Sequence, residues 1–121
     1  MQKILTTFLM AHKKLVATGR IWIEIDGENF LGAGRVELLE NIETHGSLRK
    51  AAISMGLSYR KAYYAIRAIN NLAPSPLVEL KQGGKGGGCA TLTETGRQFV
   101  IRYQQIAQRF VIFLTKQSAI F

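Results

Sequence analysis

The chain has 121 residues, and 16 lysines and arginines against 8 acidic residues give a net charge of +8. This length suits one domain with a modest core, and the 47% hydrophobic fraction is ordinary for a globular protein, which argues against a disordered or membrane-spanning chain. Cys89 is the only cysteine, which excludes an internal disulfide and a multi-cysteine metal site. The expected compartment is therefore a reducing cytoplasm.

The positive charge is unevenly distributed along the chain. Residues 1–43 hold five basic and six acidic residues, whereas residues 44–121 hold eleven basic residues against only Glu79 and Glu94. A polyanion such as double-stranded DNA is therefore expected to contact the second region.

Residues 1–17 predict a packing helix. The apolar run after Lys3 is short, contains two threonines and lacks a small-residue cleavage site, so a signal peptide is disfavoured. The apolar positions fit one helical face instead; they are Ile4, Leu5, Phe8, Leu9, Leu15 and Val16.

Residues 20–31 predict a β-hairpin, because Ile21, Ile23 and Ile25 alternate with polar-leaning positions. Asp26-Gly27 is a strong two-residue turn signal, although 28–29 could lengthen the turn. Residues 35–44 then predict a helix, closed by a glycine at position 46.

Residues 46–72, GSLRKAAISMGLSYRKAYYAIRAINNL, predict a helix-turn-helix. Ser47 and Ser58 are good N-caps for the two helices, and Gly56 suits the positive φ that a helix end often requires. The small side chains of Ala51 and Ala52 allow the second helix to cross closely. That second helix would enter a DNA major groove.

The second helix separates into two faces. Its expected buried positions are Ala62, Ala65, Ile66, Ile69 and Leu72. Three aromatic and three cationic residues remain for other faces: Tyr59, Arg60, Lys61, Tyr63, Tyr64 and Arg67. Either Tyr63 or Tyr64 could instead be a core residue. Arg60 and Lys61, near the helix N-terminus, are expected to contact phosphates or base edges.

Residues 77–92 predict a two-stranded wing with the glycine-rich tip QGGKGGG. Lys81 and Lys85 could reach phosphates from it. The tip does not fit a nucleotide-binding loop, since no serine or threonine follows its lysine and the required glycine spacing is absent. The wing completes an α+β winged helix-turn-helix, a single domain over 1–121 with the core helices in 35–72.

Residues 93–118 predict a long C-terminal helix. Apolar and aromatic residues recur along one face of this helix at steps of four and three, which is the spacing of a helix–helix interface; we call this face the seam. This apolar face could close the core of the monomer or form a homodimer. A homodimer is favoured for the part of the helix that extends beyond a compact winged helix. The expected dimer residues are Phe99, Tyr103, Ile106, Phe110, Phe113 and Leu114.

Together, the helix-turn-helix, PLVE and GGKGGGCATLTETG resemble the N-terminal DNA-binding domain of ModE-type molybdate-responsive regulators, a winged-helix relative of the LysR-type fold. The resemblance covers about residues 20–105, and GGKGGG followed by LTxxG is its most specific part. It implies sequence-specific binding of a homodimer to a palindromic operator. It places Ser58, Tyr59, Arg60 and Lys61 at the groove and Lys85 in the wing.

Two departures from the family pattern stand out. Cys89 replaces the usual glycine, and no molybdate-binding domain follows the DNA-binding region. The resemblance therefore implies a link to molybdate or metal homeostasis without direct molybdate binding to this chain, and no cofactor or metal is expected.

The prediction is a dimeric, cytoplasmic transcription regulator. The full set of expected DNA contacts is Ser47, Arg49, Lys50, Ser58, Tyr59, Arg60, Lys61, Tyr63, Tyr64, Arg67, Lys81 and Lys85. The alternative is an adaptor that docks a partner protein, or a separate molybdate-sensing chain, through the aromatic seam. Catalysis is disfavoured because His12 and His45 fall in separate elements and Cys89 has no identifiable base.

Overall fold

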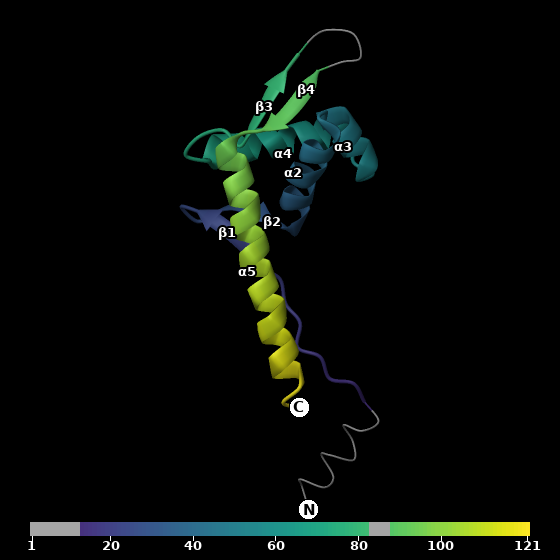
Figure 1. Cartoon of the computed structure of the whole chain (residues 1–121), viewed down its shortest axis with the longest axis vertical. Coiled ribbons are helices and arrows are strands. Elements are labelled where there is room, and N and C mark those ends of the chain that lie inside the picture. Colours follow the sequence, from purple (N-terminus) through teal and green to yellow (C-terminus); the bar gives the residue numbers. More distant parts are fainter. Residues whose placement is uncertain (1–12, 83–87) are drawn as a thin grey trace, which may run out of the picture. The chain divides into compact units, whose positions relative to one another are not determined.

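The computed structural model describes residues 13–82 and 88–121, which fall into two compact units. The first unit comprises Trp22–Gln104, and the second joins the described residues up to Ile21 to Gln105–Phe121. Figure 1 shows the elements in chain order, from the β1–β2 hairpin to the long helix α5. The expected single domain over 1–121 stays a prediction.

The hairpin consists of β1 (Trp22–Ile25) and β2 (Glu28–Gly32). Asp26 and Gly27 have φ values of 50° and 80°, so these two residues alone form the turn, without the lengthening considered above. An irregularity in the register at Ile23/Glu24 breaks the alternation of the sheet. Consecutive residues Phe30 and Leu31 are both buried as a result, which seats the hairpin on the helices.

Three helices follow: α2 (Ala33–His45), α3 (Leu48–Ser54) and α4 (Tyr59–Leu72). The predicted caps are confirmed, because Ser47 Oγ accepts from Lys50 N at 3.2 Å and Ser58 Oγ accepts from Lys61 N at 3.1 Å. Gly56 has a φ of 67°, as its place at the turn requires.

The core of the first unit lies between these helices and the hairpin. Ala51 and Ala52 are buried, as expected where two helices cross closely, whereas Ala65 and Leu72 are only half-buried. The buried residues of the helices are Val36, Leu38, Leu39, Ile42, Leu48, Ala51, Ala52, Ala62, Ile66 and Ile69.

The wing consists of β3 (Val78–Lys81) and β4 (Cys89–Leu92), paired antiparallel with Lys81 opposite Cys89. It is anchored at both strands. Ala90 N donates to Gly46 O at 3.0 Å, and the amide of Asn70 on α4 bonds three backbone groups of Leu77 and Val78 at 2.9–3.2 Å. In Figure 1 the wing lies above α4 and the β1–β2 hairpin lies below it.

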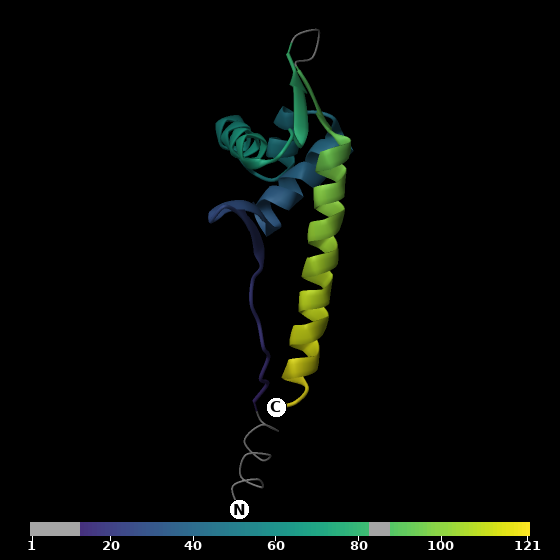
Figure 2. The same cartoon turned by 90° about the vertical axis from the view of Figure 1, so that its left-hand side faces the viewer.

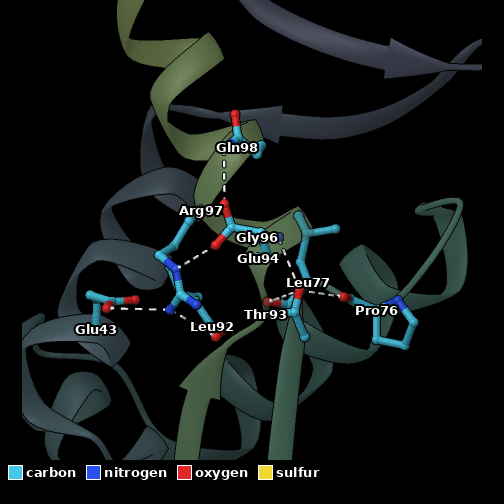
Figure 3. Close-up of polar contacts among 9 residues, drawn as sticks. All are labelled: Glu43, Pro76, Leu77, Leu92, Thr93, Glu94, Gly96, Arg97 and Gln98. Carbon is cyan, nitrogen blue, oxygen red and sulfur yellow. Dashed lines mark hydrogen bonds and ion pairs between the residues drawn. The ribbon is translucent and has the colours of Figure 1, made fainter.

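The wing passes into α5 (Glu94–Ser118) through a network of polar contacts, drawn in Figure 3. Thr93 Oγ1 accepts from Gly96 N at 3.0 Å, capping the helix, and donates to Pro76 O at 2.7 Å. Arg97 joins the exposed Glu94 and Glu43 and donates to Leu92 O at 3.2 Å. The start of α5 is therefore tied to both wing strands and to α2. These contacts, together with the wing and the helix-turn-helix, confirm the predicted α+β winged-helix fold with its long C-terminal helix.

The first turns of α5 close the core of their own unit. The ring of Phe99 meets Phe30 edge-on at 5.2 Å between centroids, and Val100 and Tyr103 are buried. Two of the six expected dimer residues, Phe99 and Tyr103, thus serve the monomer core, the other role open to this seam. Ile106 and Phe113 are exposed, and Leu114 is half-buried.

In the second unit, residues 13–21 run beside the C-terminal half of α5 (Figure 2). Ala17 N donates to Ser118 Oγ at 2.7 Å, and Gly19 packs against the ring of the half-buried Phe110. The expectation of a helix over 1–17 is wrong for residues 13–17, which are not helical. The rest of that segment, 1–12, lies outside the described residues.

No helix within the described residues is both long and apolar enough to cross a membrane.

Candidate nucleic-acid interface

A groove of about 400 Å³ lies between α3, the N-terminal half of α4 and the tip-ward ends of the two wing strands. Five of the predicted DNA contacts line it, from three separate elements: Ser47, Arg49, Tyr59, Tyr63 and Lys81. Arg49 comes from α3 and Lys81 from β3, so cations from both the helix-turn-helix and the wing contribute to the lining. Apolar side chains of Leu48 and Leu80 contribute as well.

The aromatic and cationic residues of α4 form an ordered array. Tyr59 and Tyr63, four residues apart, stack with ring centroids 6.2 Å apart and planes 17° apart. The guanidinium carbon of Arg67, another four residues on, lies 5.9 Å from the Tyr63 ring centroid. This line of side chains follows one face of α4.

A second pair of side chains lies next to the first line. The guanidinium carbon of Arg60 is 5.6 Å from the ring centroid of Tyr64, which meets Tyr63 edge-on at 6.0 Å. Tyr64 is 57% exposed and Tyr63 is half-buried, so the alternative that one of them belongs to the core is wrong. Both rings are available to a ligand on the surface of α4.

The cations of this surface are not neutralised by their own chain. Within residues 13–82 and 88–121, six of them form no ion pair: Arg49, Lys50, Arg60, Lys61, Arg67 and Lys81. Arg67 Nη1 donates to Tyr63 Oη at 3.5 Å, and this hydrogen bond raises the pKa of Arg67 above its ordinary value. The surface therefore presents fixed positive charge to an anion.

The remaining expected contacts lie outside the groove. Five of them lie on the exposed surface of α3 and α4: Lys50, Arg60, Lys61, Tyr64 and Arg67. The hydroxyl oxygens of Ser47 and Ser58 accept the capping bonds, which leaves each hydroxyl hydrogen as a donor. Lys85 lies outside the described residues.

Sequence reasoning missed several residues of the interface. Gln82, Gly88 and Cys89 line the groove, and a Cβ at Gly88 would overlap the carbonyl oxygen of Lys81. The glycine run before Cys89 could have indicated that a residue without a side chain is needed at position 88. Asn70, which holds β3 against α4, carries no signal in its own helix, because its partners lie seven and eight residues further along the chain.

The groups considered for catalysis are not assembled into a site. Cys89 is exposed and His45 ends α2, while His12 lies outside the described residues. In the part of the chain that the structure describes, no three His, Cys, Asp or Glu side chains are grouped so as to hold a metal ion.

The chain is similar in sequence to several ModE proteins and molybdenum-pterin-binding proteins, although no protein-family model matches it. The molybdenum transport protein ModE of Azotobacter vinelandii is 42% identical over 99 residues, which cover 82% of this chain and 37% of that protein. The DNA-binding transcriptional dual regulator ModE of Escherichia coli K12 is 37% identical over 86 residues, which cover 71% and 33%. The molybdenum-pterin-binding protein MopA of Rhodobacter capsulatus is 44% identical over 70 residues, covering 58% and 26%.

Solved structures support the fold. A variant of Lactococcus lactis ZitR matches 99% of this chain and 81% of its own with a TM-score of 0.55, at 14% identity. The chain spans about a third of the length of the ModE proteins that it matches. Over that span, the chain is a homologue of the ModE transcriptional regulators, with a winged-helix fold.

Proposed function

We propose that the protein is a transcription regulator that binds double-stranded DNA in a sequence-specific manner in the bacterial cytoplasm, and that it is not an enzyme. The observation that carries this proposal is the groove, where Arg49 of α3 and Lys81 of the wing accompany Tyr59 and Tyr63 of α4. Its cations are unpaired within the described residues and can neutralise phosphates. The homology to ModE regulators supports the same function.

The residues divide into two roles in this proposal. Arg49, Lys50 and Lys81 contact phosphates and set the position of the protein on the duplex, as does Lys85 of the wing tip. Side chains of α4 read base edges from the major groove; they are Tyr59, Arg60, Tyr63 and Arg67. Lys61, Tyr64 and the hydroxyls of Ser47 and Ser58 complete the contact surface.

We further propose that the regulator acts as a homodimer. Ile106 and Phe113 are seven residues apart on α5, and both are exposed. Two turns of a helix separate residues seven apart, so the two side chains lie on one face, as a helix–helix interface requires. Phe110 and Leu114 border this face. A dimer would present two α4 helices to an inverted repeat.

A role in molybdate or metal homeostasis is proposed from the relatives, whose names refer to molybdenum. Direct binding of molybdate to this chain forms no part of the proposal.

The test is selection of bound duplexes from a random DNA pool, followed by affinity measurements at two salt concentrations. The expected result is enrichment of an inverted repeat whose half-sites lie about 34–36 Å apart, or a multiple of that distance. Strong binding without enrichment that collapses with salt would show electrostatic attachment only. Absence of binding at low salt would contradict DNA binding and favour the adaptor alternative through α5.

Two single-residue variants of the protein, measured on the selected duplex, distinguish base reading from phosphate contact. Arg60→Ala is expected to cost about 1–3 kcal/mol on the selected duplex and to relax its preference at one base pair. Lys81→Ala is expected to weaken all duplexes alike and to reduce the salt slope by about one. Equal effects of the two variants on all sequences would contradict base reading by Arg60.

A further inference from the structure

The most connected side chain of the α4 surface is Tyr63. It stacks on Tyr59, meets the edge of Tyr64 and lies under the guanidinium of Arg67, with distances of 6.2, 6.0 and 5.9 Å. The proposed function gives Tyr63 the same role as Tyr59, Arg60 and Arg67, which is to read bases. The contacts indicate a different role, because three of them are to side chains of its own helix.

Tyr63 is also better held than the other two tyrosines. Its side chain is half-buried, whereas Tyr59 and Tyr64 are 52% and 57% exposed. It lines the groove, whose other walls include Leu48 of α3 and Leu80 of β3. A ring with contacts on several sides keeps one orientation and can act as a fixed platform.

Arg67 has little else to hold it. It is exposed and lies beyond the residues that line the groove, and within the described part of the chain its side chain contacts the ring and the hydroxyl of Tyr63. An arginine side chain has many rotamers, and ordering it on binding costs entropy. A platform that orders the guanidinium beforehand removes part of that cost.

We infer that Tyr63 is a positioning residue that presents Arg67 to the duplex, so that the two residues act as one recognition unit. This inference rests on the proposed DNA-binding function and deepens it. The hydrogen bond between Arg67 Nη1 and Tyr63 Oη is long, at 3.5 Å, so the ring contributes more than the hydroxyl. Tyr63→Phe should therefore keep the platform, and Tyr63→Leu should remove it.

The first measurement tests positioning in the full chain without DNA. A guanidinium over an aromatic ring places its neighbouring Hδ and Hε protons in the ring-current field, so their NMR resonances should be shifted upfield in the unaltered protein. The shift should persist in Tyr63→Phe and disappear in Tyr63→Leu. An Arg67 resonance at its random-coil position in the unaltered protein would overturn the inference.

The second measurement is a double-mutant cycle on the affinity for the selected duplex at one salt concentration. Arg67→Ala is expected to lose about 5- to 150-fold in affinity. Tyr63→Leu should lose several-fold, and the double variant should lose no more than Arg67→Ala alone, since the platform has no use without its arginine. Losses that multiply would overturn the inference.

The pair Tyr63→Leu and Lys61→Ala is the matched control for this cycle. Lys61 is an exposed cation on the same helix, and the ring contacts of Tyr63 are to Tyr59, Tyr64 and Arg67 rather than to Lys61, so the losses of this pair should multiply. Tyr63→Phe guards against a folding defect, because it should retain both the affinity and the thermal unfolding midpoint of the unaltered chain. Failure of the unaltered chain to bind any duplex would contradict the proposed function, and the NMR shift would still decide whether Tyr63 positions Arg67.

Discussion

Gly96 lies directly against the carbonyl oxygen of Leu77, so closely that a Cβ at residue 96 would overlap that oxygen. The same oxygen accepts a hydrogen bond from Thr93 N at 2.9 Å, so it cannot move away without breaking this hydrogen bond between the ends of the two wing strands. This contact gives a physical reason for the glycine in the sequence LTETG. A helix can start beside the wing here only if its first turn lacks a side chain at position 96.

Replacement of Gly96 by alanine is therefore expected to destabilise the fold by about 1–3 kcal/mol, the usual cost of forcing an atom into a packed site. Gly34→Ala is the matched control, because Gly34 is also in the first turn of a helix and a Cβ there meets nothing within 4 Å. It should be neutral or stabilising by up to about 1 kcal/mol. Urea unfolding of both variants makes the comparison, and equal midpoints would contradict the proposed role of the close contact.

Asn70 connects α4 to the wing. Its Oδ1 accepts from Leu77 N and Val78 N, and its Nδ2 donates to Val78 O at 2.9 Å. Asn70→Leu is expected to cost about 1–3 kcal/mol, because buried backbone groups lose their partners. Asn70→Asp keeps both acceptors and loses only the donor, so it should cost less. Asn71→Leu, on an exposed neighbour, is the control.

The Asn70 variants should also affect DNA binding. A wing that is no longer held against α4 brings Lys81 to phosphates less effectively, so the salt slope should fall as it does for Lys81→Ala. The measurement is the salt dependence of affinity for the selected duplex. An unchanged slope in Asn70→Leu would show that the wing keeps its position without this amide.

The contacts of Glu94 at the start of α5 predict that the stability of the fold depends on pH. Hydrogen bonds from Gln98 and Arg97, together with the charge of Arg97, lower the pKa of this carboxyl from its ordinary 4.5 (Figure 3). A carboxylate with a lowered pKa in the folded state stabilises the fold above its unfolded pKa, and this contribution is lost as the pH falls through the folded pKa. Stability should therefore fall as the solution is acidified below about pH 4.5.

The variant Glu94→Gln tests this dependence. Below that pH, the stability of this variant should fall less steeply with pH than the stability of the unaltered chain, because one titrating group with a shifted pKa has been removed. Gln98→Ala should lie between the two, since it removes the first of the hydrogen bonds. Thermal unfolding between pH 3 and pH 7 is the measurement, and parallel curves for the three proteins would contradict the assignment.

The two ends of the α5 seam should respond differently to a charge. Phe113 is 55% exposed, whereas Tyr103 is 6% exposed within its own chain. Phe113→Asp is expected to give a folded monomer by sedimentation, with loss of affinity for an inverted repeat. Tyr103→Asp should instead unfold the chain, because it buries an unpaired charge in the core. A Phe113→Asp protein of unchanged mass in solution would contradict dimerisation through this face.

Local interactions made much of the fold predictable. Ser47 and Ser58 cap helices through groups three residues away, Asp26-Gly27 forms a turn within four residues, and Gly56 adopts positive φ in the turn between two helices. Such features depend on neighbours in the chain, and their residue types reveal them. The apolar spacing of α4 likewise indicated its buried face at Ala62, Ile66 and Ile69.

The failures came where one segment packs on another. Residues 14–17 suggested a helix from their apolar spacing, yet they have no regular secondary structure and lie beside α5, where Ala17 N donates to Ser118 Oγ. The periodicity of Phe99 and Tyr103 was correct, but it could not distinguish a seam for a second copy from a seam for the chain's own core. Phe30 on the distant hairpin settles that point for Phe99.

The sequence by itself determined a basic winged helix-turn-helix, its caps and turns, and the set of cationic and aromatic side chains on α4. Only the tertiary structure showed that Arg49 and Lys81 line one groove, that Asn70 holds the wing, that Gly96 must be without a side chain, and that Tyr63 lies under Arg67. Helix and turn signals arise from backbone groups a few residues apart. Contacts between segments depend on how the elements pack and on which rotamers that packing permits, and neither can be read from the order of residues along one element.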